Sequence, residues 1–142
     1  TFEQVLLDDR QASLRVYRSF YAAGAAHPGT GLVTYTVDLL TGEFHELGDL
    51  FKPGVDHLGF LSGISRRLLE IEGVGTEETR TEGTAPEPEN FDGWVLARDG
   101  IEVTFGEYQV ASYAEGMPRI LVLRQAMGDL LALEGPLGYP AG

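Results

Sequence analysis

The sequence contains no cysteine, and this absence excludes several kinds of chemistry at once. Without thiols the chain has no disulfide bonds, no cysteine nucleophile and no thiolate ligands for a metal ion. The absence says little about the compartment, because a domain of 142 residues can fold without disulfide bonds even in an oxidising space.

Basic residues are scarce, with 10 lysines and arginines against 22 acidic residues and a net charge of −12. Phosphate backbones are bound by clustered lysine and arginine, so the composition excludes nucleic acid as the expected partner. An anionic membrane surface would repel a chain of this sign. A basic partner would be attracted to it. The alternative is that the charge only keeps the protein soluble.

Long hydrophobic runs are also missing, since no stretch approaches the ~18 apolar residues that mark a membrane span. The first residues, Thr1 to Gln4, lack the charged and apolar regions of a signal peptide. We therefore expect a mature or trimmed fragment whose targeting segment is absent. Its length predicts one domain covering residues 1–142.

Alternating residues in the first third of the chain predict two β-strands. Leu14 and Val16 share one face of the first strand, and Arg15 and Tyr17 share the other. Residues 33–39 repeat the pattern, with Val33, Tyr35, Val37 and Leu39 opposite Thr34, Thr36 and Asp38. The connection between the strands, residues 22–31, is rich in alanine and glycine and allows close backbone approach.

One amphipathic helix is predicted after Pro53-Gly54. Asp56 is suited to cap its first turn, and Gly73 is suited to end it. Apolar residues recur at helical spacing along it, namely Leu58, Leu61, Ile64, Leu68 and Ile71. We expect this helix to cover one face of the sheet.

Residues 73–90 show no periodicity and predict a long, mobile acidic loop. Between Glu70 and Asp92 there are eight acidic residues and one basic residue, a net charge of −7. The segment is either a solvated surface or a protruding recognition arm.

A hairpin is predicted between Trp94 and Phe105, with Asp99-Gly100 at the centre of a type I′ turn. That turn pairs Arg98 with Ile101, Leu96 with Val103 and Trp94 with Phe105. A last strand is predicted at 120–123, a short strand or helical turn at 127–133, and a tail from about residue 135.

Motifs for catalysis are absent. The three histidines, His27, His45 and His57, match no metal-binding spacing, and residues 24–31 lack the features of a phosphate-binding loop. We therefore predict a non-catalytic domain with no metal site and no cofactor. One alternative stays open, a cryptic hydrolase whose carboxylates converge only in the folded chain.

The candidate binding residues are polar, aromatic or glycine residues in three expected loops. They are Tyr21, Gly24 and His27 in the first loop, Asp49 and Phe51 in the second, and Tyr108, Tyr113 and Gly116 in the third. The alternative is structural, because a tyrosine or histidine at a strand end often anchors a loop by a hydrogen bond.

Five motifs in order resemble the RsiV-like extracellular domain family. They are Gly24-Ala25-Ala26-His27-Pro28, Tyr35-Thr36-Val37-Asp38-Leu39, Leu47-Gly48-Asp49-Leu50-Phe51, Asp99 to Phe105, and Tyr108 to Gly116, followed by the strand Ile120-Leu121-Val122. The resemblance extends from about Tyr21 to about Leu123.

The resemblance implies an α+β fold, a curved antiparallel β-sheet with one main helix packed on one face. It also implies an extracytoplasmic location, because the family forms the outer part of an anti-sigma factor that senses lysozyme and accompanies some peptidoglycan deacetylases. The function expected from it is binding of a basic protein such as lysozyme, or of a cell-wall component. The alternatives are an accessory domain of a cell-wall-processing enzyme, the cryptic hydrolase and a purely structural module.

Overall fold

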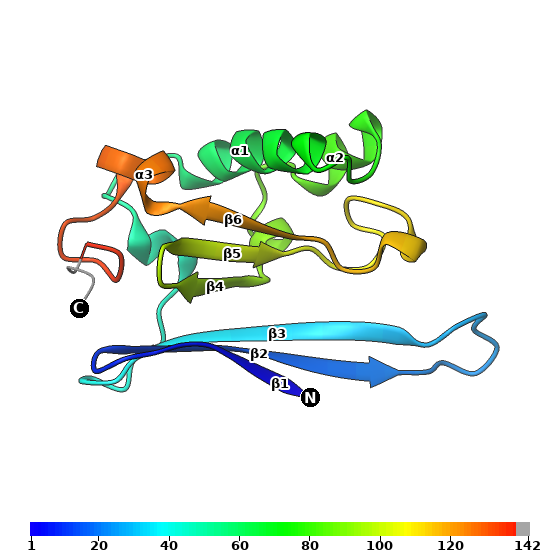
Figure 1. Ribbon diagram of the computed structural model, residues 1–142, viewed down its shortest axis with the longest axis horizontal. Coiled ribbons are helices and arrows are strands. Elements are labelled where there is room, and N and C mark those ends of the chain that lie inside the picture. The colour runs from blue at the N-terminus through cyan, green and yellow to red at the C-terminus, as the bar shows by residue number, and fades with distance from the viewer. Residues whose placement is uncertain (139–142) are drawn as a thin grey trace.

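A computed structural model describes residues 1–138 and contains two three-stranded antiparallel sheets (Figure 1). The first sheet is β1 (Phe2–Leu7), β2 (Gln11–Phe20) and β3 (Gly29–Asp38), and the second is β4 (Trp94–Ala97), β5 (Gly100–Thr104) and β6 (Arg119–Leu123). The helices are α1 (His57–Ile71), α2 (Glu77–Gly83) and α3 (Arg124–Met127), with 3-10 turns η1 (Leu47–Leu50), η2 (Pro88–Phe91), η3 (Tyr113–Glu115) and η4 (Gly128–Leu130). The α+β class is confirmed, and the strands form two sheets rather than one curved sheet.

The two faces of the first sheet follow the predicted alternation. Val16 lies between Phe2 and Val33, and this row belongs to the apolar face. The next residue of β2, Arg15, lies between Glu3 and Thr34 on the polar face. Because side chains alternate along a strand, each sheet face keeps one chemical character.

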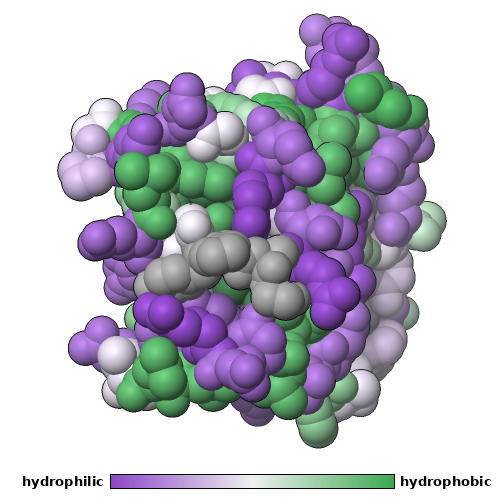
Figure 2. Space-filling view, turned by 60° about the vertical axis from the view of Figure 1, so that its left-hand side comes forward, coloured by the Kyte–Doolittle hydropathy of each residue, from purple (hydrophilic) through white to green (hydrophobic). Residues whose placement is uncertain are grey.

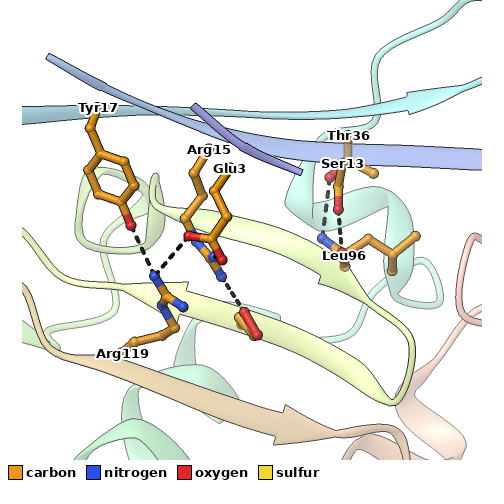
Figure 3. A network of polar contacts seen from close by, with 8 residues as sticks. Glu3, Ser13, Arg15, Tyr17, Thr36, Leu96 and Arg119 are labelled. Carbon is orange, nitrogen blue, oxygen red and sulfur yellow. Dashed lines mark hydrogen bonds and ion pairs between the residues drawn. The ribbon is translucent and has the colours of Figure 1, made fainter. Parts of the chain in front are cut away.

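The polar face of the first sheet points inward, against the edge of β4 (Figures 1 and 3). An edge strand exposes backbone N–H and C=O groups that have no partner in their own sheet. The Ser13 hydroxyl donates to the backbone oxygen of Leu96, and the Leu96 N–H donates to Thr36 Oγ1 over 3.3 Å. Polar side chains are therefore needed here, because they satisfy backbone groups that an apolar face would leave unpaired.

A fully buried arginine lies on the same polar face (Figure 3). Arg15 forms ion pairs with Glu3, at 3.0 Å, and with Glu102 of β5. Arg119 of β6 donates to the Tyr17 hydroxyl over 3.0 Å and pairs with Glu3 at 3.5 Å. This network joins β1 and β2 to the second sheet through charges that have partners on both sides.

The apolar face of the first sheet points outward. Its exposed side chains include Phe2 and Val33, which are 70% and 53% exposed, and Phe44, which follows β3 and bridges back to Val37. The rings of Tyr35 and Phe44 lie 5.9 Å apart. In Figure 2, hydrophobic residues are visible along the lower edge of the molecule, where Figure 1 places the first sheet.

The β4–β5 hairpin differs from the predicted register. Trp94 pairs with Val103, Leu96 with Ile101, and Ala97 with Gly100, so the turn is Arg98-Asp99 and the prediction was displaced by two residues. A shift of two keeps every side chain on its face, and Trp94 and Phe105 are buried as predicted. Gly100 pairs within β5 rather than in the turn. Glycine is needed at this position because a Cβ there would collide with the backbone of β6.

Helix α1 covers the apolar face of the second sheet. Its N-cap is Asp56, as predicted, and the carboxylate accepts from the Gly59 N–H over 3.0 Å. The fully buried positions are Leu61, Ser62, Ser65 and Leu69. Of the other predicted apolar residues, Leu58, Ile64 and Leu68 are half-buried and pack against the same core, whereas Ile71 is 69% exposed. Leu61 and Leu69 pack in one core with the inward residues of β4, β5 and β6.

The acidic segment is not the irregular loop that its composition predicts. Thr76 caps α2 by accepting from the Thr79 N–H, and the Thr79 hydroxyl donates to the Val110 backbone oxygen over 2.7 Å. Arg66 of α1 donates to Thr84, which is fully buried. The segment folds through these tertiary hydrogen bonds rather than through an apolar stripe, which is why periodicity failed to find it.

The C-terminal region is partly packed, contrary to the predicted tail. Leu131 forms an isolated bridge with Phe51, and Leu137 is 3% exposed. Residues 139–142 of the predicted tail lie outside the described residues. Within residues 1–138 no helix has the length and apolar character of a membrane span.

Candidate functional site

The hairpin tip between β2 and β3 carries the first group of predicted site residues. Gly24 has a φ of +84°, a conformation that favours glycine. The Tyr21 hydroxyl donates to the Ala25 backbone oxygen over 2.8 Å and closes the loop. His27 follows at the point where the chain returns toward β3.

The loop after β5 carries the second group. Tyr108 is the one non-glycine residue with positive φ among the described residues, at 65°. Beside it, the Gln109 side chain accepts from the Gly106 N–H over 2.8 Å and donates to the backbone oxygens of Gly83 and Asn90, over 2.9 and 2.8 Å. Gln109 therefore joins this loop to α2 and to η2, and fixes the strained turn at Tyr108.

These two loops meet in an aromatic group, which we call the His27 cluster and which consists of His27, Tyr108 and Tyr113. The His27 and Tyr113 rings stack with centroids 3.7 Å apart. His27 Nε2 lies 2.7 Å from the Tyr108 hydroxyl oxygen, and the Tyr113 hydroxyl donates to the Pro28 backbone oxygen over 3.0 Å. The cluster holds the hairpin tip against the loop after β5.

An open cavity of about 520 Å³ lies beside the His27 cluster. Three elements form it: the β2–β3 hairpin, the η2 turn and the loop after β5. It is lined by Phe20, Ala22, Ala25, His27, Gly29, Thr30, Gly31, Leu32, Glu89, Asn90, Asp92, Gly93, Thr104, Gly106, Glu107, Tyr108, Gln109 and Met117. We call it the acidic cavity, because it has three carboxylates and no lysine or arginine among these residues.

The carboxylates of the acidic cavity have few protein partners. Glu107 accepts from the Thr30 N–H over 2.5 Å. Partial burial, and then the negative charge of Glu89, raise the pKa of Asp92 above its usual value. In residues 1–138 none of the three carboxylates forms an ion pair. The cavity is therefore an uncompensated negative site.

Thr104 adds a buried polar group to the lining. This residue is 4% exposed, and its hydroxyl has no hydrogen-bond partner within the described part of the chain. Buried hydroxyl groups are usually hydrogen-bonded, and this one is enclosed, so it meets a ligand atom in the cavity only if the Thr104 side chain rotates toward it.

The structure brings most of the predicted site residues together. Tyr21, Gly24, His27, Tyr108 and Tyr113 lie in the two facing loops, and Gly116, with a φ of +71°, ends η3 in the second of them.

Asp49 and Phe51 lie elsewhere, in a separate pocket that they share with Ala132, Glu134 and Gly135. Asp49 accepts from the Glu46 N–H over 2.8 Å. Phe51 is buried in the core, and its ring stacks on His57 at 5.4 Å. Both have structural roles.

Sequence reasoning missed the acidic side of the site. Glu89 falls in the predicted mobile loop, Asp92 at the end of the acidic stretch that contains this loop, and Thr104 in the predicted hairpin. No spacing in the sequence connects these residues to His27, because they converge only when η2 and the end of β5 pack against the first hairpin. Within residues 1–138 no group of three histidine or acidic residues is arranged to hold a metal ion.

Comparison with known proteins agrees with an α+β domain of this architecture. Residues 48–124 match the family described as "Protein of unknown function (DUF3298)". The chain belongs to the DUF3298 family.

The chain is similar to one characterised relative and to two solved structures. The chain is 31% identical over 124 residues to "Peptidoglycan-N-acetylmuramic acid deacetylase PdaC" of Bacillus subtilis (strain 168), covering 86% of this chain and 27% of that protein. A DUF3298 protein of Bacteroides fragilis NCTC 9343 has a TM-score of 0.76 and 22% identity, over 96% of this chain and 55% of its own. One of Pseudomonas aeruginosa PAO1 has a TM-score of 0.68 and 13% identity, over 99% and 64%. The chain thus spans about a quarter of the length of this relative from B. subtilis. The family match and the similar structures confirm the family and the fold.

Proposed function

We propose that this protein is a non-catalytic, extracytoplasmic binding domain that recognises a basic protein through the end bearing the His27 cluster and the acidic cavity. The observation that carries the proposal is the cavity itself, with three carboxylates, apolar walls and no lysine or arginine. A site of this kind attracts a cation and disfavours an anion. The proposed location is supported by the relative from B. subtilis, whose name gives peptidoglycan as its substrate.

The charge of the surrounding surface supports the same class of partner. The segment from Glu70 to Asp92 has a net charge of −7, and in the structure it forms α2 and η2, on the side of the molecule that also supplies Glu89 and Asp92 to the cavity. A negative field over this surface steers a basic protein toward it and raises the association rate at low ionic strength. Lysozyme, the partner sensed in the RsiV-like family, is a suitable probe because it is a basic extracellular protein.

A binding experiment tests the proposal. Immobilised protein is exposed to lysozyme, to an acidic protein of similar size and to insoluble peptidoglycan, at low and at physiological salt. We expect lysozyme to bind with an association rate that falls as salt rises, and the acidic protein not to bind. Retention on peptidoglycan alone would favour the cell-wall alternative, and no binding to either would contradict the proposal.

A second candidate, the cryptic hydrolase, is favoured by one observation. Asp92 has a raised pKa beside a second carboxylate, which is the arrangement of a general acid and its partner in glycoside hydrolysis. Its test is the release of soluble fragments from purified peptidoglycan. Release that Asp92→Asn abolishes would replace binding with hydrolysis as the function of this cavity.

A further inference from the structure

The walls of the acidic cavity are largely apolar. Phe20, Leu32 and Met117 contribute hydrophobic surface, and the Phe20 ring packs over Gly29, where a Cβ would lie only 2.5 Å from it. A ligand that lies along these walls without loss of hydrogen bonds must itself be apolar over most of its length. A sugar ring would leave its hydroxyl groups against hydrocarbon, whereas an aliphatic stem would not.

The carboxylates require the end of that ligand to be positive. Partial burial, and then the nearby negative charge of Glu89, raise the pKa of Asp92, so the ionised form of Asp92 lacks a compensating positive charge. Glu107 is already oriented by the Thr30 N–H. A cation placed among the three would relieve the repulsion, because it favours the ionised form of each carboxyl group.

Thr104 provides a neutral acceptor near the same place. Its hydroxyl is buried and without a partner in the described residues. An ammonium group has three N–H donors directed away from its stem. Two of them can reach carboxylates, and the third can reach the Thr104 hydroxyl, which is enclosed in the free protein, once that side chain rotates toward the cavity. The planar guanidinium of arginine presents its donors in a fixed fork, which suits one bidentate carboxylate better than groups from three chain segments.

We propose that the acidic cavity is a subsite for a single lysine side chain of the protein partner, with Glu89 and Asp92 binding the ammonium group and Phe20, Leu32 and Met117 packing on its four-carbon stem. This inference rests on the proposed function and goes beyond it by naming the group that is recognised. The His27 cluster forms the adjacent rim and keeps the hairpin tip in place.

The test uses small probes on the intact chain, followed by NMR of the backbone amides. The first probe is Nα-acetyl-lysine methylamide, and its matched control is the norleucine analogue, which keeps the stem and lacks the ammonium group. We expect the lysine probe to shift the amide signals of Gly93 and Thr104, and the norleucine probe to leave them in place. The arginine analogue and glucosamine complete the set, and stronger binding of either would overturn the assignment to lysine.

Two variants separate recognition from folding. Asp92→Asn removes one charge, and we expect it to weaken binding of the lysine probe by about tenfold or more, the effect of losing a hydrogen bond between charged groups. Thr104→Val removes an unpaired buried hydroxyl, so this variant should fold as well as the wild type. We still expect it to bind the lysine probe more weakly. Asp129→Asn, on the exposed η4 turn away from the lining residues, is the control and should bind normally.

The same variants distinguish failure of the subsite from failure of the proposed function. If lysozyme binds the wild type and Asp92→Asn equally, the lysine subsite is wrong while protein binding stands. If the lysine probe binds but no basic protein does, the subsite stands and the proposed partner is wrong. Equal binding of the lysine and norleucine probes would leave the carboxylates without a role and overturn the inference.

Discussion

Sheet β4-β5-β6 turns Ile101, Val103 and Val122 toward α1 and buries all three, whereas sheet β1-β2-β3 turns Ser13, Arg15 and Thr36 inward and leaves Val33 exposed on its outer face. The difference follows from what each sheet meets. A helix presents apolar side chains, so the second sheet packs with hydrocarbon. The first sheet meets the edge of β4, whose backbone groups need hydrogen-bond partners. The polarity of each sheet face therefore matches the groups it packs against: side chains of a helix in one case and backbone groups of an edge strand in the other.

The largest expected difference between the sheets is in large-to-small substitutions. Phe105→Ala removes a fully buried ring from the core of the second sheet, and we expect a loss of about 3–5 kcal/mol in the free energy of unfolding. Phe44→Ala, on the outer side of the first sheet, removes a ring that is 65% exposed and should change it by less than about 0.5 kcal/mol. Urea denaturation measures both, and similar losses would show that the outer face is not free of contacts.

The buried ion pair is the next test. Glu102→Gln removes one partner of fully buried Arg15, and we expect a loss of about 3 kcal/mol, the low end for such pairs, because Glu3 remains. The double variant Arg15→Met/Glu102→Leu leaves no uncompensated charge and should be more stable than Glu102→Gln. A double variant that is less stable than the single one would mean that the pair itself, rather than its desolvation balance, stabilises the contact between the sheets.

A smaller effect is expected at the hydroxyl groups that face β4. Ser13→Ala leaves the Leu96 backbone oxygen without its donor, and we expect a loss of about 1–3 kcal/mol. Ser19→Ala, on the same strand but exposed, is the matched control and should stay within about 0.5 kcal/mol of the wild type. Thermal unfolding of the two variants side by side is sufficient, and equal melting temperatures would remove the edge-pairing explanation for the polar face.

The smallest effects concern pH, at two carboxylates beside the loop after β5. Asp92 has a raised pKa, so it binds protons more tightly in the folded protein, and its contribution is present at low pH and lost as pH rises through the folded pKa. Glu115 has a lowered pKa, because it accepts from the Gly75 N–H, and its contribution is present at neutral pH and lost as pH falls. Relative to wild type, Asp92→Asn should therefore lose least at pH 7, and Glu115→Gln least at acidic pH. Melting temperatures from pH 3 to 7 give the comparison, and parallel curves for the two variants would contradict it.

The sequence predicts this fold well where a local pattern, such as alternation or helix capping, is enough to define an element. Alternation placed β2 and β3, and the Asp56 cap and Gly73 bounded α1. Prediction from the sequence fails where the local structure depends on a contact with a distant segment of the chain. Gly100 suits a turn by local preference, but its lack of a Cβ is used for close packing on β6. Residues 77–83 have no apolar stripe, and their helix depends on contacts with α1 and with Val110.

The residues of the candidate site also differ in whether the sequence could predict them. His27, Tyr108 and Tyr113 are predicted from the sequence because they are polar or aromatic residues in loop segments that contain glycine. Glu89 and Asp92 did not, because they are two of 22 acidic residues and nothing local distinguishes them. Their role depends on the η2 turn lying against β3, where Thr34 donates to the Asp92 backbone oxygen over 3.0 Å.

The polar inner face of the first sheet also predicts an order in which the chain acquires its structure. Strands β1 to β3 leave the ribosome before β4 to β6, yet the face that joins them to the second sheet is mostly polar, with Leu6 packed against the hydrophobic core. Glu3 finds Arg119 only after 116 further residues have been made. Contacts so distant in sequence form slowly, so the amino-terminal third should stay open to solvent until β4 to β6 are complete. Pulse-labelling hydrogen exchange during refolding should then show protection of Ser13 and Arg15 no earlier than that of Ile101 and Val122.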